Sequence, residues 1–446
     1  MLAEQNTVAL RPELLERLNE ARRQTDDLFG IVNRDALYDR PIPERHRIIF
    51  YVGHLEAFDW NLLHDRLFRL KSFHPELDRL FAFGIDPVDG GLPSDQPADW
   101  PSLQEVTQYV TNIRESLDKA LLNIDLSETA SREGADFSPS ILLNVVIEHR
   151  LMHAETLTYM LHQLPLQKKI KQSAQAEIHV PALNPGMIEI PAGTATLGLR
   201  RSENVFGWDN EFEEQSVEVP AFAIDRYMVT NGEFVKFVEA GGYENRDLWA
   251  AADWDWKQAQ SIAFPSFWRR MDDRWFLRTM FDNVPLPLNW PVYVSHAEAS
   301  AYARWVGKAL PTEAQWHRAA YGTPEGKERN YPWGKNEPSA KLGNFDFERW
   351  DPASVSAFAE GQSAFGVEGL LGNGWEWTSS VFAPLPGFKP FSFYLGYSAD
   401  FFDGKHLVMK GGSTRTAASM LRRSFRNWFQ SHYQYVYAGF RCVSKS

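Results

Sequence analysis

The feature that most constrains the fold is a change of sequence pattern near residue 173. Residues 1–172 place apolar side chains at helical spacing over long stretches, which predicts helices that bury one face. Residues 173–186 are polar and then rich in proline, whereas residues 187–446 consist of short apolar runs broken by Gly, Pro, Asn and Asp. We therefore expect an α + (α+β) fold class. A helical bundle is expected over residues 1–172, a linker over 173–186 and a loop-rich α+β domain over 187–446.

Four helices are expected in the first part of the chain, enough for a four-helix bundle. Pro12 suits the first turn of the first helix, and the second helix is expected over residues 44–71. Ser102 and Glu105 form a capping box at the start of the third helix, and Ser138, followed by a proline, caps the fourth. In such bundles, metal sites are built from side chains on facing helices.

Length, charge and cysteine content exclude several classes of protein. The chain has 446 residues, too many for one typical core, so two domains are expected. A net charge of -12 argues against a nucleic-acid partner, because phosphate binding needs a basic surface. The single cysteine, Cys442, excludes a disulfide within the chain and a cysteine-rich zinc site. The charged N-terminus lacks a signal peptide and no apolar run reaches membrane-spanning length, so we expect a cytoplasmic protein with no membrane partner.

Two histidines in the stretch VVIEHRLMHAET predict a metal site. His149 and His153 lie four residues apart, so both rings project from one face of the fourth helix and could hold a first-row metal ion. Glu155 lies elsewhere around that helix. His54 lies on an inward stripe of the second helix and would complete a three-histidine set with open coordination positions, as in a catalytic site. The alternative is a set of buried, hydrogen-bonded histidines, and ligand type alone does not choose between zinc and iron.

Residues 185–443 carry a series of phrases in order, among them MIEIPAGTATLG, PVYVSHAEASAYARWVGKALPTEAQWHRAA, LLGNGWEWTSS and SFRNWFQ. Together these phrases resemble the formylglycine-generating-enzyme (sulfatase-modifying factor) fold, a C-type-lectin-like domain. Formylglycine generation needs a pair of reactive cysteines. This chain has one, so that activity does not follow from the fold.

The phrases GHLEAFDWN and HRLMH give the first half a resemblance to DinB-type four-helix bundles. A DinB-type bundle followed by a formylglycine-generating-enzyme-like domain is similar to the ergothioneine sulfoxide synthase family. That family uses non-haem iron and O₂ to join a sulfur donor to the imidazole of hercynine, the Nα-trimethylated histidine. The resemblance implies Fe(2+) as the cofactor, His54, His149 and His153 as its ligands, and hercynine, O₂ and a thiol donor as partners.

The resemblance also implies substrate contacts, and some of them depart from the family. Asn427 and Trp428 match residues that lie beside hercynine, and an aromatic face suits a trimethylammonium group. The alternative for Trp428 is a position in the core, since the chain has 16 Trp. Phe429 stands where one branch carries an acidic residue that helps hold the donor, and Met152 stands where many relatives carry glutamine.

Two further departures concern the charge clamp and the proton donor of the family. The loop over residues 80–100 has no Arg or Lys, whereas one branch uses arginines there to pair with carboxylates of the donor. Relatives use a tyrosine as proton donor, and phenylalanines stand at the matching positions of this chain: Phe81, Phe83 and Phe382. If the alignment is shifted by a few residues, Tyr394 or Tyr397 would be the proton donor, so the catalytic residue stays unassigned.

These departures favour the selenoneine synthase branch, because a selenosugar donor has no carboxylate to clamp and a selenol is more acidic than a thiol. The expected function is a non-haem Fe(II), O₂-dependent oxidoreductase that forms a C–Se or C–S bond at hercynine. One alternative is an ergothioneine sulfoxide synthase that uses cysteine or γ-glutamylcysteine. Two others are a non-catalytic zinc-containing binding module and a zinc-dependent thiol transferase. The sequence leaves the donor and the oligomeric state open.

Overall fold

The computed structural model describes residues 2–85, 92–122, 124, 138–173, 178, 180, 182–201 and 205–445. The chain divides into two compact units, Met1–Gln172 and Ser173–Ser446, which we call unit 1 and unit 2. Among the described residues, none of the helices combines the length and the apolar character that a membrane-spanning segment requires.

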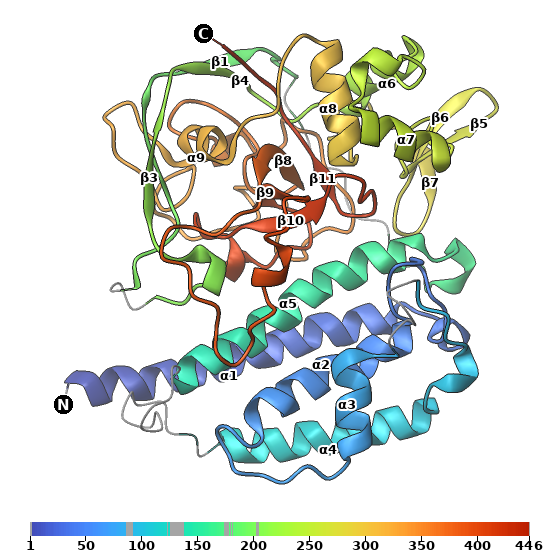
Figure 1. The fold of residues 1–446 in the computed structure, drawn as a ribbon, viewed down its shortest axis with the longest axis vertical. Coiled ribbons are helices and arrows are strands. Elements are labelled where there is room, and N and C mark those ends of the chain that lie inside the picture. Colours follow the sequence, from blue (N-terminus) through green and yellow to red (C-terminus); the bar gives the residue numbers. More distant parts are fainter. Residues whose placement is uncertain are drawn as a thin grey trace. The chain divides into compact units, whose positions relative to one another are not determined.

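Unit 1 is helical, with four long helices and one short helix among its described residues (Figure 1). Helix α1 packs along α5, whereas α2 contacts α3, α4 and α5, so α2 lies at the centre of the unit. The apolar faces of these helices form the core, as the helical spacing predicts. The bounds are α1 (Leu2–Gly30), α2 (Ile48–Leu63), α3 (Pro75–Phe83), α4 (Leu103–Leu121) and α5 (Pro139–Gln163).

Local capping signals set the starts of α4 and α5. The side chain of Ser102 accepts a hydrogen bond from the backbone N–H of Glu105, and the Glu105 carboxylate accepts one from the N–H of Ser102. Ser138 Oγ accepts a hydrogen bond from the N–H of Ile141 at 3.3 Å. Both predicted caps are therefore confirmed.

Other predictions for unit 1 are wrong in detail. Pro12 lies inside α1 and not in its first turn. The helix extends on the N-terminal side of Pro12 although the proline removes one backbone donor and its ring crowds the preceding turn. Helix α2 is shorter than the expected range of 44–71. Helix α3 is absent from the prediction. It begins after His74, whose Nδ1 accepts a hydrogen bond from the N–H of Leu77 at 3.3 Å.

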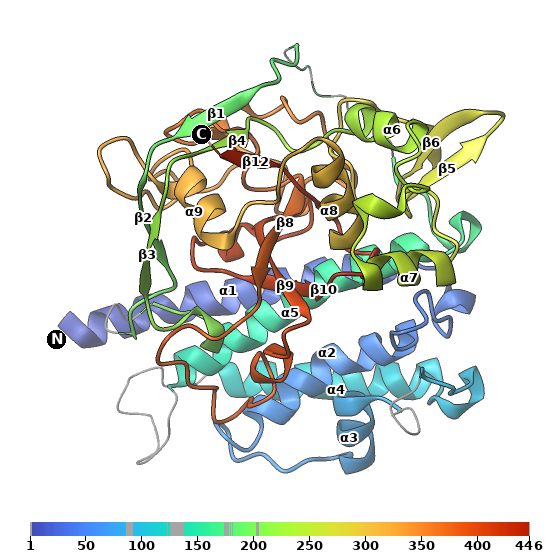
Figure 2. The ribbon, with the colours of Figure 1, turned by 45° about the horizontal axis from the view of Figure 1, so that its top comes forward.

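Unit 2 consists of short strands and short helices joined by long loops (Figure 2). Its described strands form four small sheets. One sheet has the order β1-β4-β12 (Met187–Ile190, Phe222–Asp225, Val443–Lys445), and another has the order β10-β9-β8-β11 (Asn427–Gln430, His406–Gly412, Gly374–Val381, Ala438–Gly439). Strand β2 pairs with β3 (Gly193–Leu197, Gln215–Val219), and the last sheet has the order β5-β6-β7 (Trp268–Met271, Arg274–Arg278, Asn283–Pro285). The helices are α6 (Asn231–Glu239), α7 (Ala251–Ala259), α8 (His296–Trp305) and α9 (Glu313–Tyr321).

Large aromatic residues hold these short elements together. Helix α9 packs against β2, β3, β8 and β9 and places Trp316 in the core. Strand β8 carries the phrase WEWT, and its residues from Gly374 to Thr378 are buried. Glu376 in that strand forms an ion pair with Arg441 at 2.6 Å, with both side chains fully buried. The helical bundle followed by a loop-rich α+β unit confirms the expected fold class.

Candidate metal centre

Helices α2 and α5 bring three histidines together inside unit 1. The ligand nitrogens of His54, His149 and His153 all lie within 4.8 Å of one another. The Nε2 atoms of His54 and His153 are 3.2 Å apart. Among the described residues, this is the group of His, Cys, Asp and Glu side chains whose geometry suits a shared metal ion. The helical spacing of the sequence therefore selects residues that do meet in space.

A backbone carbonyl of α3 orients the ring of His54. The Nδ1 atom of His54 donates a hydrogen bond to the carbonyl oxygen of Phe81 at 2.7 Å. This bond keeps the proton on Nδ1 and leaves the lone pair of Nε2 directed toward the other histidines. The ring of Phe81 packs so closely on α2 that a Cβ atom at Gly53 would lie 2.5 Å from it. Gly53 therefore allows the close approach that this hydrogen bond requires.

Two phenylalanine rings of α2 support the histidine rings. Phe58 stacks on His149 with ring centroids 3.4 Å apart and an angle of 10° between the planes. Phe50 stacks on His54 at 4.7 Å and 26°. Such contacts restrict the rotation of the imidazoles and exclude water from their faces.

Burial keeps the three imidazoles in the neutral form that binds metals. Burial lowers the pKa of His54 from 6.5 to about 4, while the hydrogen bond to the Phe81 carbonyl acts in the opposite direction. Burial also holds the pKa values of His149 and His153 well below the ordinary value, and the neighbouring histidines add to that effect. At neutral pH all three rings therefore have a lone pair available.

These residues fit a first-row metal ion. Two imidazole nitrogens that bind one ion at about 2.1 Å lie roughly 3 Å apart, close to the separation of the Nε2 atoms of His54 and His153. The Nδ1 atoms of His149 and His153 are buried and have no hydrogen-bond partner among the described residues. Three neutral nitrogen ligands with no carboxylate among them leave positions for other molecules on the ion.

The neighbours of the cluster on α5 do not join it. Glu155 is buried but does not belong to the group that could hold a metal, as its place around the helix predicts. Met152, the expected substrate contact of this helix, is half-buried and directly precedes His153. Tyr51 of α2 lies on the same inward stripe as His54, three residues before it. Its buried ring lies 5.8 Å from that of His153.

In unit 2, the expected substrate residues lie on the edge strand β10. Trp428 stacks on Phe382 with ring centroids 4.1 Å apart and 8° between the planes. Tyr397 meets the Trp428 ring edge-on at 5.6 Å, and Phe401 lies 5.7 Å away. We call these four residues the Trp428 cluster. Because Trp428 is only partly buried, the cluster offers an aromatic surface and is not simply part of the core.

The other expected contacts on β10 point to the opposite face of the strand. Asn427 and Phe429 flank Trp428, and side chains alternate between faces along a strand. The Asn427 side chain accepts a hydrogen bond from the N–H of Trp428 at 2.8 Å, and Phe429 stacks on Tyr433 at 4.7 Å. The structure therefore brings Trp428 together with Phe382 and separates it from its two neighbours in sequence.

The three phenylalanines that the resemblance matches to tyrosine positions differ sharply in environment. Phe81 and Phe382 are fully buried, whereas the side chain of Phe83 is 68% exposed. Tyr397 lies in the Trp428 cluster, and Tyr394 lies 5.6 Å from Tyr397, ring to ring.

The loop without Arg or Lys recruits arginines from another segment. Asp95 has a fully buried side chain that pairs with Arg40 and Arg47 and accepts a hydrogen bond from Trp100 Nε1 at 2.7 Å. These arginines come from the segment before α2, and the Asp95 carboxylate engages both of them. Residues 86–91 of this loop lie outside the described part of the chain.

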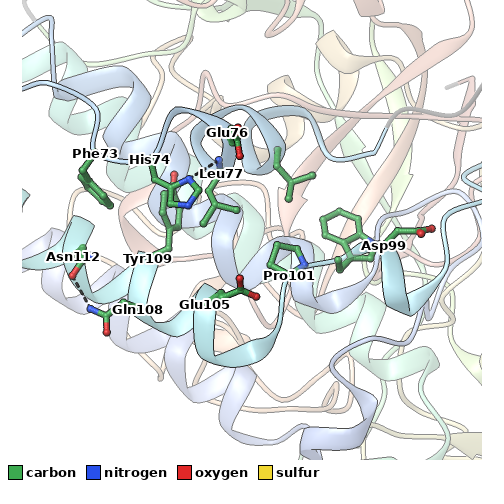
Figure 3. A pocket seen from close by; sticks show the side chains of 12 residues that line it. Phe73, His74, Glu76, Leu77, Asp99, Pro101, Glu105, Gln108, Tyr109 and Asn112 are labelled. Atoms are coloured by element: carbon green, nitrogen blue, oxygen red, sulfur yellow. Dashed lines mark hydrogen bonds between the residues drawn. The ribbon is translucent and has the colours of Figure 1, made fainter.

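A separate pocket of about 560 Å³ lies between α3 and α4 (Figure 3). His74, Glu76 and Leu77 of the α3 side face Glu105, Gln108 and Tyr109 of α4, and Asp99 and Pro101 close one end. Its polar groups make local hydrogen bonds, for example between the side chains of Gln108 and Asn112. None of the three histidines of the cluster lines this pocket.

Comparison with known proteins adds information on both units. A family model for the sulfatase-modifying factor enzyme 1-like domain matches residues 173–446, and the model for the DinB superfamily matches residues 17–157. Both models agree with the expected order of a DinB-type helical domain and a formylglycine-generating-enzyme-like domain.

Relatives match almost the whole chain. The chain is 37% identical to the hercynine oxygenase of Mycolicibacterium smegmatis over 97% of its own length and 98% of that protein. It is also 37% identical to the hercynine oxygenase of Mycolicibacterium thermoresistibile, over 97% and 94% of the two chains. It is 28% identical to ergothioneine biosynthesis protein 1 of Neurospora crassa, over 92% of this chain and 55% of that one.

Proposed function

The chain belongs to the family of the hercynine oxygenases, and from this premise we propose that it is an iron-dependent enzyme that oxidises hercynine at the imidazole ring. The observation that carries the proposal is the convergence of three neutral imidazoles in unit 1, of which His149 is buried and His153 is partly exposed. Relatives named for hercynine oxygenation and ergothioneine biosynthesis support hercynine as the substrate.

We assign Fe(2+) to His54, His149 and His153, where it would supply the activation of O₂. The chain itself holds the three lone pairs in place. The Phe81 carbonyl retains the proton on His54 Nδ1, and Phe58 prevents rotation of the His149 ring. Burial excludes water and keeps protons off the ligand nitrogens at neutral pH.

With a thiol as the donor, the proposed reaction balances without a further reductant. The imidazole C–H bond and the S–H bond break, a C–S bond forms, and the sulfur becomes a sulfoxide. One oxygen atom of O₂ enters the sulfoxide, and the other leaves as water with the two hydrogens. O₂ thus accepts four electrons, two from formation of the C–S bond and two from oxidation of the sulfur. A selenol donor would give a selenoxide by the same balance.

Trp428 is the residue that we assign to the trimethylammonium group of hercynine. A fixed cation is attracted to the face of an indole ring, and Phe382 holds that ring in one orientation from the other side. Asn427, Phe429 and Met152 are further proposed contacts with the substrates. Tyr397 carries a hydroxyl in the Trp428 cluster and is our candidate for the proton donor.

The names of the relatives favour a thiol donor such as γ-glutamylcysteine or cysteine. A selenosugar is the second candidate, and specific observations favour it. Phe429, which the resemblance matches to an acidic residue that helps hold the donor in one branch, stacks on Tyr433, and Asp95 engages Arg40 and Arg47. A neutral donor needs neither a carboxylate nor a free guanidinium from the protein.

Anaerobic loading with Fe(II), followed by measurement of O₂ uptake, tests the proposal. We expect about one iron per chain and O₂ uptake only when hercynine and a donor are both present. Mass spectrometry of the product, after competition among γ-glutamylcysteine, cysteine and a selenosugar, identifies the donor. The variant His54→Ala should fold and lose turnover.

Three results would contradict the proposal. Full activity in an iron-free preparation would exclude the iron centre. Bound zinc with no O₂ uptake would indicate the zinc-containing binding module, or a thiol transferase if a thiol adduct formed. Full turnover by His54→Ala would remove that residue from the metal site.

A further inference from the structure

An ionic network lies in the core of unit 1, next to the three histidines. Its centre is Arg150 of α5, whose side chain is completely buried. Its Nη1 lies 2.9 Å from Glu56 Oε1, and its Nη2 lies 2.6 Å from Asp59 Oδ2. Both carboxylates belong to α2 and are about 1% exposed. A single guanidinium therefore holds two side chains of α2, about one turn apart, against α5.

The network extends to the other two long helices. Arg150 Nη1 lies 3.5 Å from Thr25 Oγ1 of α1. Arg114 of α4 donates to Glu56 at 2.8 Å and pairs with Asp26 of α1 at 2.7 Å. The positions of α1, α2, α4 and α5 are therefore linked through one connected set of charged side chains.

The contacts of Arg150 fall beside the metal ligands in the sequence. Arg150 directly follows His149, and its Nη2 also donates to the carbonyl oxygen of Leu55 at 3.1 Å. Leu55 directly follows His54. The guanidinium thus joins the backbone of α2 to α5 within one residue of a ligand on each helix, where a small sliding of one helix would separate the ligand nitrogens.

Stability alone does not account for this network. Ion pairs this deeply buried cost desolvation, and apolar residues of similar volume often serve stability as well or better. The network is also not fully hydrogen-bonded: among the described residues, Arg150 Nε, Glu56 Oε2 and Asp59 Oδ1 have no partner. What a bidentate guanidinium provides, and an apolar contact does not, is a fixed direction and register between two helices.

We propose that Arg150 is a positioning residue that fixes α5 against α2, so that His54, His149 and His153 can bind one ion together. The proposal rests on the proposed function only in requiring a divalent metal at these histidines. It concerns metal affinity and geometry, and it is independent of the donor and of the reaction.

The variant Arg150→Lys tests the proposal, because it keeps the positive charge and loses the planar two-armed geometry. The probe is Co(II) added to metal-free protein, read by its visible absorption spectrum and by competition with a chelator. We expect affinity to fall about 10- to 100-fold, in the range found when residues that orient metal ligands are replaced. The cobalt spectrum should change in shape, because the histidines no longer meet in the same geometry.

A second variant separates positioning from folding. The triple variant Arg150→Met, Glu56→Gln and Asp59→Asn removes the three central charges together, and Arg114 keeps Asp26 as its ion-pair partner. We expect it to melt near the temperature of the unchanged metal-free protein and to bind Co(II) at least 10-fold more weakly. If Arg150→Lys does not fold, the Co(II) affinity of the triple variant tests the positioning role of Arg150.

A buried ion pair in unit 2 provides the matched control. Arg441 pairs with Glu376 at 2.6 Å, and both side chains are fully buried. Arg441→Lys makes the same chemical change in a unit without the three histidines, and it should leave the affinity and spectrum of Co(II) unchanged.

The outcomes distinguish this proposal from the proposed function. Unchanged affinity and spectrum in Arg150→Lys, or in a folded triple variant, would overturn the role of Arg150. Tighter Co(II) binding in either variant would also overturn it, because the arginine would then act through charge repulsion. Failure of the unchanged protein to bind Co(II) or Fe(II) would instead overturn the proposed metal site.

Discussion

The histidine cluster of unit 1 and the Trp428 cluster of unit 2 are built in different ways. The three histidines come from two regular helices, and Phe50 and Phe58 that support them come from one of those helices. The Trp428 cluster takes its members from an edge strand and from loops scattered along the last part of the chain. Each cluster thus depends on a different level of structure.

This difference predicts which binding property a substitution in each cluster should alter. Regular helices held by a buried ionic network give nitrogen atoms fixed positions, as a metal ion requires. Aromatic rings on a partly open strand give a surface whose shape and charge distribution suit an organic cation. We therefore expect changes in the first cluster to alter metal binding. Changes in the second should alter the binding of hercynine or, at Tyr397, turnover, and should leave metal affinity unchanged.

Acidification should affect the histidine cluster most strongly. Burial lowers the pKa of His54 to about 4, against 6.5 when unfolded, so the unfolded chain binds an extra proton between these values. The free energy of unfolding of the metal-free protein should therefore fall as pH decreases from 6.5 to 4, by about 3 kcal/mol from His54 alone. His149 and His153 act in the same direction. Denaturant titration followed by circular dichroism at several pH values measures this slope.

Two variants give this measurement its control. His54→Asn should show a smaller pH slope, whereas Trp428→Phe should keep the full slope, since the Trp428 cluster contains no histidine. Stability that does not change between pH 6.5 and pH 4 would contradict the neutral state of the three rings.

Gly53→Ala should weaken the metal site without touching a ligand. The added Cβ atom would lie 2.5 Å from the Phe81 ring, so Phe81 and its carbonyl must move away from His54. We expect a loss of about 10-fold in Co(II) affinity and destabilisation of about 1–3 kcal/mol from overpacking. Gly30→Ala is the control, because nothing lies within 4 Å of a Cβ at that position. Equal Co(II) affinity in both variants would show that the carbonyl of Phe81 does not orient the ligand.

Trp428→Ala should raise the KM for hercynine and leave Co(II) affinity unchanged. A cation–π contact contributes about 0.5–2 kcal/mol, which corresponds to roughly a 2- to 30-fold change in binding. Trp428→Phe should retain part of the effect, because a benzene ring keeps the quadrupole. A fall in metal affinity in Trp428→Ala would show that the Trp428 cluster also affects metal binding, contrary to this expectation.

Phe83→Ala should have the smallest effect. The Phe83 side chain is 68% exposed, whereas that of Phe81 is fully buried. We expect a stability change within about 0.5 kcal/mol and unchanged Co(II) affinity and turnover. A large loss of turnover would place Phe83 in the chemistry, contrary to its environment in this structure.

Local patterns in the sequence predicted a large part of the fold and of the metal site. The caps at Ser102 and Ser138 involve residues only three positions apart, so they can be read directly from the chain. The same holds for His149 and His153, whose shared direction follows from the helical repeat. Helix α3 was missed because its nine residues are too few for a clear periodic signal.

The order of residues along the chain is enough to show which side chains can face each other along a helix, because each residue turns the α-helix by a fixed angle. The sequence also shows that the one cysteine precludes chemistry requiring two. Three contacts could be found only in the folded structure: the Phe81 carbonyl with His54, Arg150 of α5 with α2, and Phe382 with Trp428. The physical reason is that these contacts join residues far apart in the chain, and their geometry depends on how whole elements pack.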